Sequence, residues 1–171
     1  MNTKIIIQAS ANSLGNTHKI VQLLNTSKNF DVVDLTTKKI DHFDYNFKNT
    51  EDDFLPFIKE IITKYDTIIF ATPVYWYSMS GVLKVFFDRL SDLLIKHKEL
   101  GRQLRGKNMA MLSNSAYNDL KDGFTMPFIE SAKYLGMNYI GDTHIWFTKE
   151  GKEIHPDAIQ KLNDFKNIFD S

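Results

Sequence analysis

The chain of 171 residues contains no cysteine. Disulfide bonds, a thiolate nucleophile, and zinc or iron–sulfur sites with cysteine ligands are therefore excluded within this chain. Lysine plus arginine and aspartate plus glutamate number 21 each, so the chain has no net charge at neutral pH. Because binding to a phosphate backbone or an acidic membrane surface needs an excess of positive charge, we expect neither nucleic acid nor membrane as a partner.

Long apolar runs and the common nucleotide-binding motifs are also missing. No apolar stretch approaches the length of a membrane span, and the N-terminal run is too short for the core of a signal peptide. We therefore expect a cytoplasmic location. The sequence has neither the P-loop motif G-x-x-x-x-G-K-S/T nor the dinucleotide fingerprint G-x-G-x-x-G. Its first predicted strand ends without paired acidic residues, which argues against a magnesium-dependent phosphoacceptor domain.

Short apolar runs alternate with helical patterns along the whole chain. Five runs have the length and composition of buried strands: 4–9, 30–35, 67–71, 108–112 and 139–147. Five segments place apolar residues three or four positions apart and predict helices: 17–24, 53–64, 82–95, 126–135 and 156–169. In the last helix we expect Ile159, Leu162, Phe165 and Phe169 to face inward.

This alternation predicts an α/β fold, a three-layer doubly wound sheet of five parallel strands in the order 2-1-3-4-5. The nearly all-apolar strands agree with it, because parallel strands are buried on both faces. We expect residues 1–171 to form a single domain. In such sheets ligands bind beyond the carboxyl ends of the strands. The loops that follow the first, third and fourth strands are therefore the expected site.

The loop after the first strand, residues 10–17, is rich in hydroxyl and amide groups and contains neither Lys nor Arg. Free backbone N–H groups at a helix N-terminus, with the helix dipole behind them, form an anion site. Ser and Asn side chains add donors. Such a site would hold a phosphate group by hydrogen bonds. The alternative is that Asn16 or Thr17 simply caps the helix.

Three consecutive aromatic residues, Tyr75, Trp76 and Tyr77, occupy the loop after the third strand. Large rings are costly to leave in water. Adjacent side chains cannot all point into the core, so we expect at least one ring to face a cleft or a partner. A flat aromatic ligand would cover these rings. Ser80 is predicted to cap the helix that follows.

Together these two loops resemble those of the flavodoxin-like superfamily, and in particular its branch of NAD(P)H-dependent oxidoreductases, which includes NADPH-dependent FMN reductases. Ser10-x-x-Ser13-x-Gly15-Asn16-Thr17 resembles the loop that binds the FMN phosphate in this family. The stretch Pro73-Val74-Tyr75-Trp76-Tyr77-Ser78-Met79-Ser80-Gly81 resembles its isoalloxazine loop. The resemblance implies an FMN-binding domain, NADPH or NADH as electron donor, a small-molecule acceptor and a homodimer.

The resemblance also implies which residues contact the cofactor. Those expected around the phosphate are Ser10, Asn12, Ser13, Gly15, Asn16 and Thr17. Those expected along the flavin, with backbone N–H groups aimed at its edge, are Pro73, Val74, Tyr75, Trp76, Tyr77 and Ser78. From the loop after the fourth strand, Ser113, Asn114 and Tyr117 are expected at the cofactor. Many family members carry glycines in that loop, and this sequence has none there. No metal ligands are expected.

The implied activity is electron transfer from a nicotinamide through FMN to a flat acceptor: a quinone, a nitro or azo aromatic, or free flavin. Hydride transfer requires no side-chain acid or base, so no catalytic residue is assigned. Two alternatives stay open, an electron carrier of the flavodoxin type and an FMN-free binding domain. Flavodoxins are usually strongly acidic, so the absence of net charge favours the reductase.

Several features have two interpretations. The basic residues Lys96, Lys98, Arg102, Arg105 and Lys107 either stabilise a helix C-terminus or dock the 2′-phosphate of NADPH. The irregular segment 36–52, in which Phe43, Tyr45 and Phe47 alternate with other residues, either packs on its own domain or serves a dimer or roofs the flavin. We expect His18 and His144 to be structural, and Arg89 to form a structural ion pair.

Overall fold

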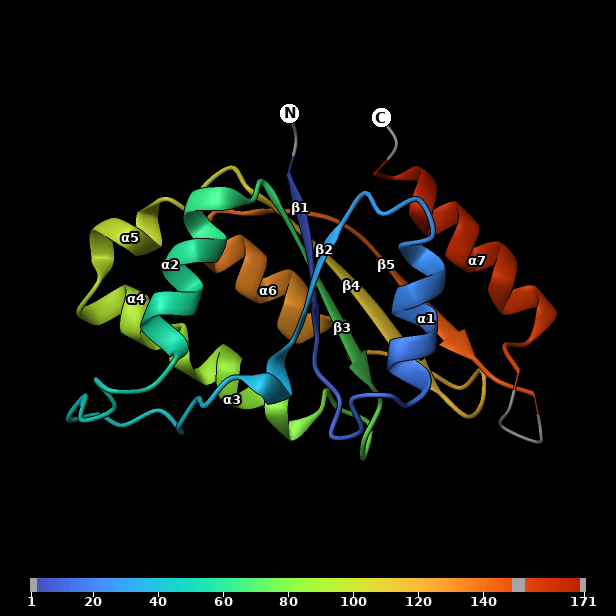
Figure 1. Cartoon of the computed structure of the whole chain (residues 1–171), viewed down its shortest axis with the longest axis horizontal. Coiled ribbons are helices and arrows are strands. Elements are labelled where there is room, and N and C mark those ends of the chain that lie inside the picture. Colours follow the sequence, from blue (N-terminus) through green and yellow to red (C-terminus); the bar gives the residue numbers. More distant parts are fainter. Residues whose placement is uncertain (1–2, 149–152, 170–171) are drawn as a thin grey trace.

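A computed structural model of the chain describes residues 3–148 and 153–169. Its centre is one sheet in the strand order β2-β1-β3-β4-β5 (Figure 1). The strands are β1 (Lys4–Gln8), β2 (Asp31–Asp34), β3 (Thr67–Pro73), β4 (Asn108–Ser115) and β5 (Asn138–Trp146). All neighbouring strands are parallel, so the predicted fold class and strand order are confirmed.

Helices cover both faces of the sheet, because successive strand residues point to opposite sides and each side is apolar. Ile6 and Ile69 belong to a core shared with α1 and α7, whereas Ile5 and Ile7 belong to a core shared with α2, α3 and α6. The helices are α1 (Asn16–Leu24), α2 (Phe54–Lys64), α3 (Gly81–Arg89), α4 (Ser91–Ile95), α5 (Lys98–Arg102), α6 (Met126–Leu135) and α7 (Pro156–Asn167). None of the helices in the described residues is long and apolar enough to cross a membrane.

The predicted helix 82–95 is wrong as one element, because the structure divides it into α3 and α4 at Leu90. At this point the Leu90 N–H bonds to the carbonyl of Phe87, three residues back, instead of the residue four back. After the break Leu93 stays in the core, whereas Leu94 is 38% exposed. Two short elements, α5 and a 3-10 turn at Leu35–Thr37 (η1), were not expected from the sequence.

Two further expectations require correction. Strand β4 runs to Ser115, three residues beyond its predicted end, because its polar last residues still pair with β3 and β5. In α7, Leu162, Phe165 and the following Phe169 are buried as expected, but Ile159 is 47% exposed. The sequence periodicity alone did not distinguish the edge of the apolar face from its centre.

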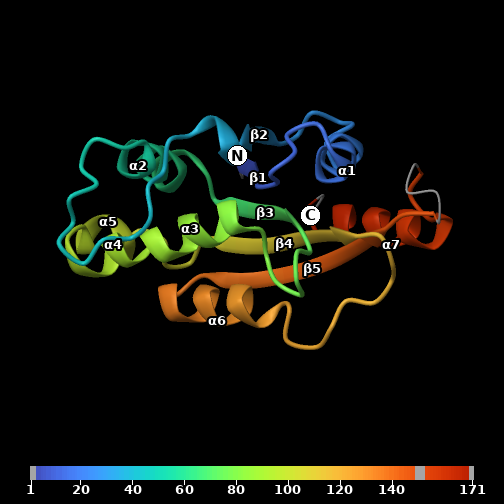
Figure 2. The same ribbon diagram turned by 90° about the horizontal axis from the view of Figure 1, so that it is seen from below.

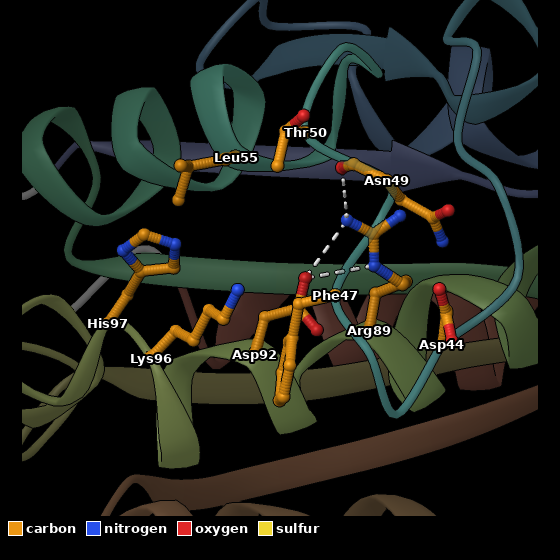
Figure 3. Close-up of a pocket in the computed structure, with 9 residues that line it drawn as sticks. All are labelled: Asp44, Phe47, Asn49, Thr50, Leu55, Arg89, Asp92, Lys96 and His97. Atoms are coloured by element: carbon orange, nitrogen blue, oxygen red, sulfur yellow. Dashed lines mark hydrogen bonds and ion pairs between the residues drawn. The ribbon is translucent and has the colours of Figure 1, made fainter.

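The segment between η1 and α2 is held against α3 and α4 by Arg89, whose side chain is only 2% exposed. Arg89 forms ion pairs with Asp52 and Asp92, and it donates to the backbone carbonyls of Asp41 and Asn49. Figure 3 shows the guanidinium with Asn49 and Asp92 on either side. The expected structural ion pair of Arg89 is therefore confirmed.

The aromatic residues of this segment contact one another. The ring of Phe43 meets those of Tyr45 and Phe47 edge to face, and Lys96 lies over Phe47 at 4.5 Å. A cavity of about 230 Å³ lies between the segment and the two helices (Figure 3). The segment thus packs on its own domain. Viewed from below, it passes over α3 and α4, to one side of the loop that follows β3 (Figure 2).

Candidate cofactor site

Helix α1 begins without a side-chain cap. Its N-cap is Gly15, and no side chain accepts a hydrogen bond from the first turn. The first N–H group to bond inside the helix is that of Lys19, which donates to the Gly15 carbonyl. Among the described residues, the backbone N–H groups of Asn16, Thr17 and His18 have no partner. The capping alternative is therefore wrong, and the helix presents free donors where an anion site needs them.

The loop that leads into α1 is fixed from behind by Gln8. The Gln8 amide donates to the Ser13 carbonyl at 2.8 Å, and its oxygen faces His18 Nδ1 at 3.2 Å. The Ser13 hydroxyl is within 2.9 Å of Thr36 Oγ1 and thus joins the loop to η1. His18 has the structural contact expected of it, and Ser13 supports the loop from outside the cavity described next.

A cavity of about 390 Å³ lies between the loops that follow β1, β3 and β4. These loops meet because all carboxyl ends of a parallel sheet lie at one edge, which faces the viewer in Figure 2. Polar groups line the α1 end of the cavity, while the opposite end is formed by β3 and β4. Its lining residues are Ser10, Asn12, Gly15, Asn16, Thr17, Pro73, Val74, Tyr75, Asn114, Ser115, Ala116 and Phe147.

The loop after β3 is a tight two-residue hairpin. Tyr75 and Ser78 exchange backbone hydrogen bonds of 2.9 and 3.0 Å. The two residues between them, Trp76 and Tyr77, have φ angles of 49° and 63°. Bulky residues rarely adopt this left-handed conformation, and turns of this kind favour Asn-Gly. The backbone therefore holds two large rings in a strained geometry, next to Tyr75, which lines the cavity.

Both rings face outward. Trp76 is 94% exposed and Tyr77 67% exposed, which confirms that the aromatic residues do not all enter the core. Behind them Ser80 accepts a hydrogen bond from the Leu83 N–H, as predicted for the cap of α3. The Ser80 hydroxyl donates to the Ala9 carbonyl at 2.7 Å and anchors the hairpin to the end of β1.

A second cavity of about 290 Å³ adjoins the first, and Val74, Ser115 and Ala116 line both. Its other walls are the hairpin and the loop that follows β4. The remaining lining residues are Trp76, Tyr77, Tyr117, Asp119, Leu120, Lys121 and Phe124. The two cavities together extend from a polar helix N-terminus to an aromatic-lined slot.

Asn114 connects the three loops. Its Oδ1 accepts the Thr17 hydroxyl at 2.7 Å, and its carbonyl accepts the Val74 N–H at 2.8 Å. The neighbouring Ser113 is fully buried and points away from both cavities, with its hydroxyl 2.9 Å from His144 Nδ1. Residues 113–115, which were expected in the loop after the fourth strand, therefore belong to β4 itself.

Most of the predicted site residues lie together. Twelve of the fifteen line one or both cavities: Ser10, Asn12, Gly15, Asn16, Thr17, Pro73, Val74, Tyr75, Trp76, Tyr77, Asn114 and Tyr117. Ser13, Ser78 and Ser113 line neither. Ser115, Ala116 and Phe147 line the first cavity but were not among the predicted contacts. Ser115 and Ala116 lie inside the third expected loop, whereas nothing in the pattern around Phe147 indicated a contact.

The hairpin backbone offers fewer donors than the resemblance implied. The N–H groups of Val74, Tyr75 and Ser78 already bond to protein carbonyls. Pro73 has no N–H group. Within the stretch 73–78, and counting only partners in the described part of the chain, the free backbone donors are those of Trp76 and Tyr77.

The basic stretch lies at the other end of the sheet. Lys107 directly precedes β4, and Ser115 at the far end of this strand lines both cavities. Eight strand residues at about 3.3 Å each separate the two ends by roughly 26 Å. Arg102 pairs with Glu99, and Lys107 donates to the Tyr65 carbonyl at 2.7 Å. This arrangement favours the structural interpretation over docking of the NADPH 2′-phosphate.

A parallel sheet in this order, with adjoining cavities formed by three loops at its carboxyl edge, defines a flavodoxin-like domain. The sequence matches the NADPH-dependent FMN reductase family over residues 3–152, so the chain belongs to this family. The resemblance stated from the sequence is thereby confirmed.

The individual relatives agree. The chain is 30% identical over 106 residues to the Bacillus subtilis protein YwqN, named as an NAD(P)H-dependent FMN-containing oxidoreductase, and the match covers 58% of this chain and 57% of YwqN. The chain spans about half the length of the curated relatives it matches.

Solved structures show the same fold. The Trp repressor binding protein of Bacillus subtilis superposes with a TM-score of 0.73 at 22% identity, covering 96% of this chain and 97% of that chain. General stress protein 14 of Treponema denticola, solved in complex with FMN, superposes with a TM-score of 0.63 at 18% identity, covering 98% of each chain. At these identities the likeness concerns the fold alone.

Proposed function

We propose that this chain binds FMN and uses it to pass electrons from NADPH or NADH to a flat acceptor, such as a quinone, a nitro or azo aromatic, or free flavin. The observation that carries the proposal is the pair of adjoining cavities, one polar at a helix N-terminus and one lined by aromatic rings. FMN has the same two-part chemistry, since it joins a phosphate to a planar ring system.

The donor set fits a phosphate without a positively charged side chain. Asn16 and Thr17, whose N–H groups have no partner among the described residues, line the first cavity, and the roughly +0.5 charge of the helix N-terminus adds to their attraction for an anion. The buried Ser10 hydroxyl accepts the Asn12 N–H at 3.3 Å and keeps its own hydrogen to donate. Among the residues that the structure describes, no Lys or Arg lines this cavity, so hydrogen bonds carry the binding.

The aromatic slot fits a planar ring. Trp76, Tyr77 and Tyr117 are exposed around it, and a flat ligand would remove their apolar surface from water. The free N–H groups of Trp76 and Tyr77 are the hairpin donors left to bond a polar ring edge. The buried Thr17–Asn114 hydrogen bond holds the two ends of the site in a fixed relation.

When bound, a flavin supplies the redox chemistry, because it accepts a hydride from a nicotinamide and releases electrons to an acceptor. The chain's own residues then bind and orient it. The exposed rings also leave one side of the slot open to solvent, which suits exchange of a donor and an acceptor at the same place.

The test is an absorbance spectrum of the purified protein after FMN is added and the excess removed, followed by anaerobic NADPH and, separately, NADH. Retained flavin that bleaches with a nucleotide supports the proposal and identifies the donor. Retained flavin that neither nucleotide bleaches supports an electron carrier instead. If no flavin is retained, steady-state NAD(P)H oxidation with free FMN separates a reductase that uses FMN as a substrate from an FMN-free domain.

Riboflavin, which lacks the phosphate, is the matched control and should bind more weakly.

We further propose a homodimer in the cytoplasm. A groove of about 380 Å³ between α3, α4 and α6 supports the dimer, since it is flanked by the exposed apolar residues Leu94, Met126 and Tyr134. Met126→Glu should then shift the mass measured by light scattering from dimer to monomer. A wild-type chain that is monomeric at micromolar concentration would contradict the dimer.

A further inference from the structure

His144 lies on β5 beside the end of β4, where Ser115 lines both cavities, and the residue is only 6% exposed. Three groups of the neighbouring segment contact its ring. Nδ1 is 2.9 Å from the Ser113 hydroxyl, and Nε2 is 3.1 Å from the Ser115 hydroxyl and 3.2 Å from the Tyr117 carbonyl. Every one of these partners belongs to the end of β4 or to the loop that follows it.

The hydrogen-bond pattern determines which ring nitrogen carries the proton. The Ser115 hydroxyl donates its own hydrogen to the Tyr117 carbonyl at 2.6 Å. Around Nε2, the Ser115 oxygen and the Tyr117 carbonyl are therefore both acceptors, so Nε2 must be the donor. Nδ1 then accepts from the Ser113 hydroxyl. Ser113 has a single hydroxyl hydrogen, and Nδ1 at 2.9 Å is a closer acceptor than the Thr143 carbonyl at 3.4 Å. A neutral imidazole with its proton on Nε2 therefore fits the closest contacts of the ring.

The surroundings support this neutral form. Burial lowers the pKa of His144 from its ordinary value of 6.5, although the Tyr117 carbonyl and the charge of Asp119 act in the opposite direction. Lys161 on α7 also lowers the pKa, and it lies over the Trp146 ring that stacks beside His144. His155 stacks with Trp146 as well, and it makes no hydrogen bond to the loop after β4.

We propose that His144 is a positioning residue for the flavin site: its Nε2–H fixes Ser115 and Tyr117, and thereby sets the wall against which the ring of the cofactor lies. The inference rests on the proposed function, because it takes the second cavity as the place of the flavin ring. Ser115 lines both cavities and Tyr117 lines the second, so a shift of either residue changes the shape of the slot.

This role also explains how the segment 113–118 can keep a fixed shape although it contains no glycine. A loop that approaches a cofactor closely often relies on glycine, because glycine adopts backbone conformations closed to other residues. Residues 113–118 contain none. Here the end of β4 supplies rigid backbone up to Ser115, and the buried imidazole ties down the next turn through the Tyr117 carbonyl.

Two substitutions separate positioning from packing. The amide nitrogen of His144→Gln reaches about as far along the side chain as Nε2 and keeps a donor for Ser115 and Tyr117. His144→Asn places its amide near Nδ1 and loses that donor. We expect H144Q to keep the dissociation constant for FMN within about threefold of wild type, and H144N to raise it about tenfold or more, as for a lost buried hydrogen bond.

Two measurements on each variant make the test decisive. One is FMN titration followed by quenching of flavin fluorescence. The other is hydrogen exchange of the apoprotein, in which residues 116–121 should exchange faster in H144N than in H144Q. The control is His155→Gln, which alters the other imidazole on Trp146 and should leave both readouts unchanged.

Equal FMN affinity and equal exchange in H144N and wild type would overturn the inference. A loss in H155Q as large as in H144N would also overturn it, since the effect would then pass through general packing on Trp146. A wild-type chain that takes no FMN in either role, bound or as a substrate, would overturn the proposed function itself. The failure of the function and the failure of the inference are therefore distinguishable.

Discussion

The Thr17 hydroxyl donates to the Oδ1 of Asn114 across 2.7 Å, and both side chains are buried. This hydrogen bond joins the first turn of α1 to the end of β4, two elements that are 97 residues apart along the chain. Because the Asn114 carbonyl also accepts the Val74 N–H, one residue controls the relation of all three loops at the site.

Asn114→Ala should therefore weaken FMN binding about tenfold, since it removes a buried hydrogen bond and leaves the Thr17 hydroxyl unsatisfied. The matched control is Asn118→Ala, which alters an exposed amide four residues later that lines neither cavity. Fluorescence titration with FMN measures both variants. Equal affinity in Asn114→Ala and wild type would show that the bond does not organise the site.

The strained hairpin predicts opposite effects on stability and binding. The double substitution Trp76→Asn with Tyr77→Gly supplies residues suited to the left-handed φ angles, so the apoprotein should be about 1–3 kcal/mol more stable. The same change removes two rings from the slot and should weaken FMN binding roughly tenfold. Thermal unfolding and FMN titration check the two effects.

Trp76→Phe is the control for this hairpin, because it keeps a ring while leaving the backbone strain in place. It should retain most of the FMN affinity and none of the added stability. If the double variant binds FMN as tightly as wild type, the exposed rings do not cover the flavin.

We expect a large loss of stability when the side chain of Arg89 is replaced by an apolar one. Arg89→Leu leaves the buried Asp52 carboxylate without its cationic partner, which should cost about 3–5 kcal/mol in the free energy of unfolding. Arg102→Ala removes an exposed pair with Glu99 and should cost at most about 1 kcal/mol. Urea unfolding measures both. A loss below about 1 kcal/mol in Arg89→Leu would contradict the view that this pair holds the segment 38–53.

We expect the ionised Asp52 carboxylate to make the free energy of unfolding fall in acid. Burial opposes its ionisation, but hydrogen bonds from Arg89 and from the backbone of Asp41 and Phe54 outweigh burial and hold the pKa of Asp52 below its ordinary value of 3.8. The unfolded chain thus binds this proton more readily than the folded chain. The stability contributed by Asp52 is complete above pH 3.8 and is lost as the pH falls through the lower folded pKa.

The measurement compares wild type with Asp52→Asn by urea unfolding from pH 7 down to about pH 3. The difference in unfolding free energy should stay constant above pH 3.8 and shrink below it. A difference that does not change with pH would contradict the lowered pKa of Asp52.

The sequence predicted the sheet well because its signal is local. Each of the five apolar runs overlaps one strand, although the prediction of a buried strand is wrong for β2, which lies at the edge of the sheet and has no buried residue. Gly136, in a left-handed conformation with φ 73°, ends α6 at the predicted residue. The break at Leu90 was not predictable in the same way. The apolar spacing continues through it, whereas the neighbouring Arg89 is drawn inward by Asp52, a partner 37 residues away.

The parts of the site that have an unusual local composition could be predicted from the sequence. Hydroxyl and amide residues before α1 and aromatic residues after β3 are unusual enough to be recognised. The polar end of β4 was taken for a loop, since Ser113 and Asn114 have no apolar side chain to mark a strand. Ser113 is buried against His144, and Asn114 is buried with a hydrogen bond from Thr17. Both partners come from distant parts of the chain, so the local sequence pattern could not predict them.

The length of β4 divides the site into a part that belongs to the sheet and a part that is a replaceable connection. Everything up to Ser115 belongs to the sheet, and only residues 116–125 form the connection to α6. A graft that replaces this connection with another sequence would change the surface offered to an acceptor and leave the phosphate end as it is. Under the proposed function, the choice of acceptor can therefore change through this connection alone, while the residues proposed to bind the phosphate keep their positions.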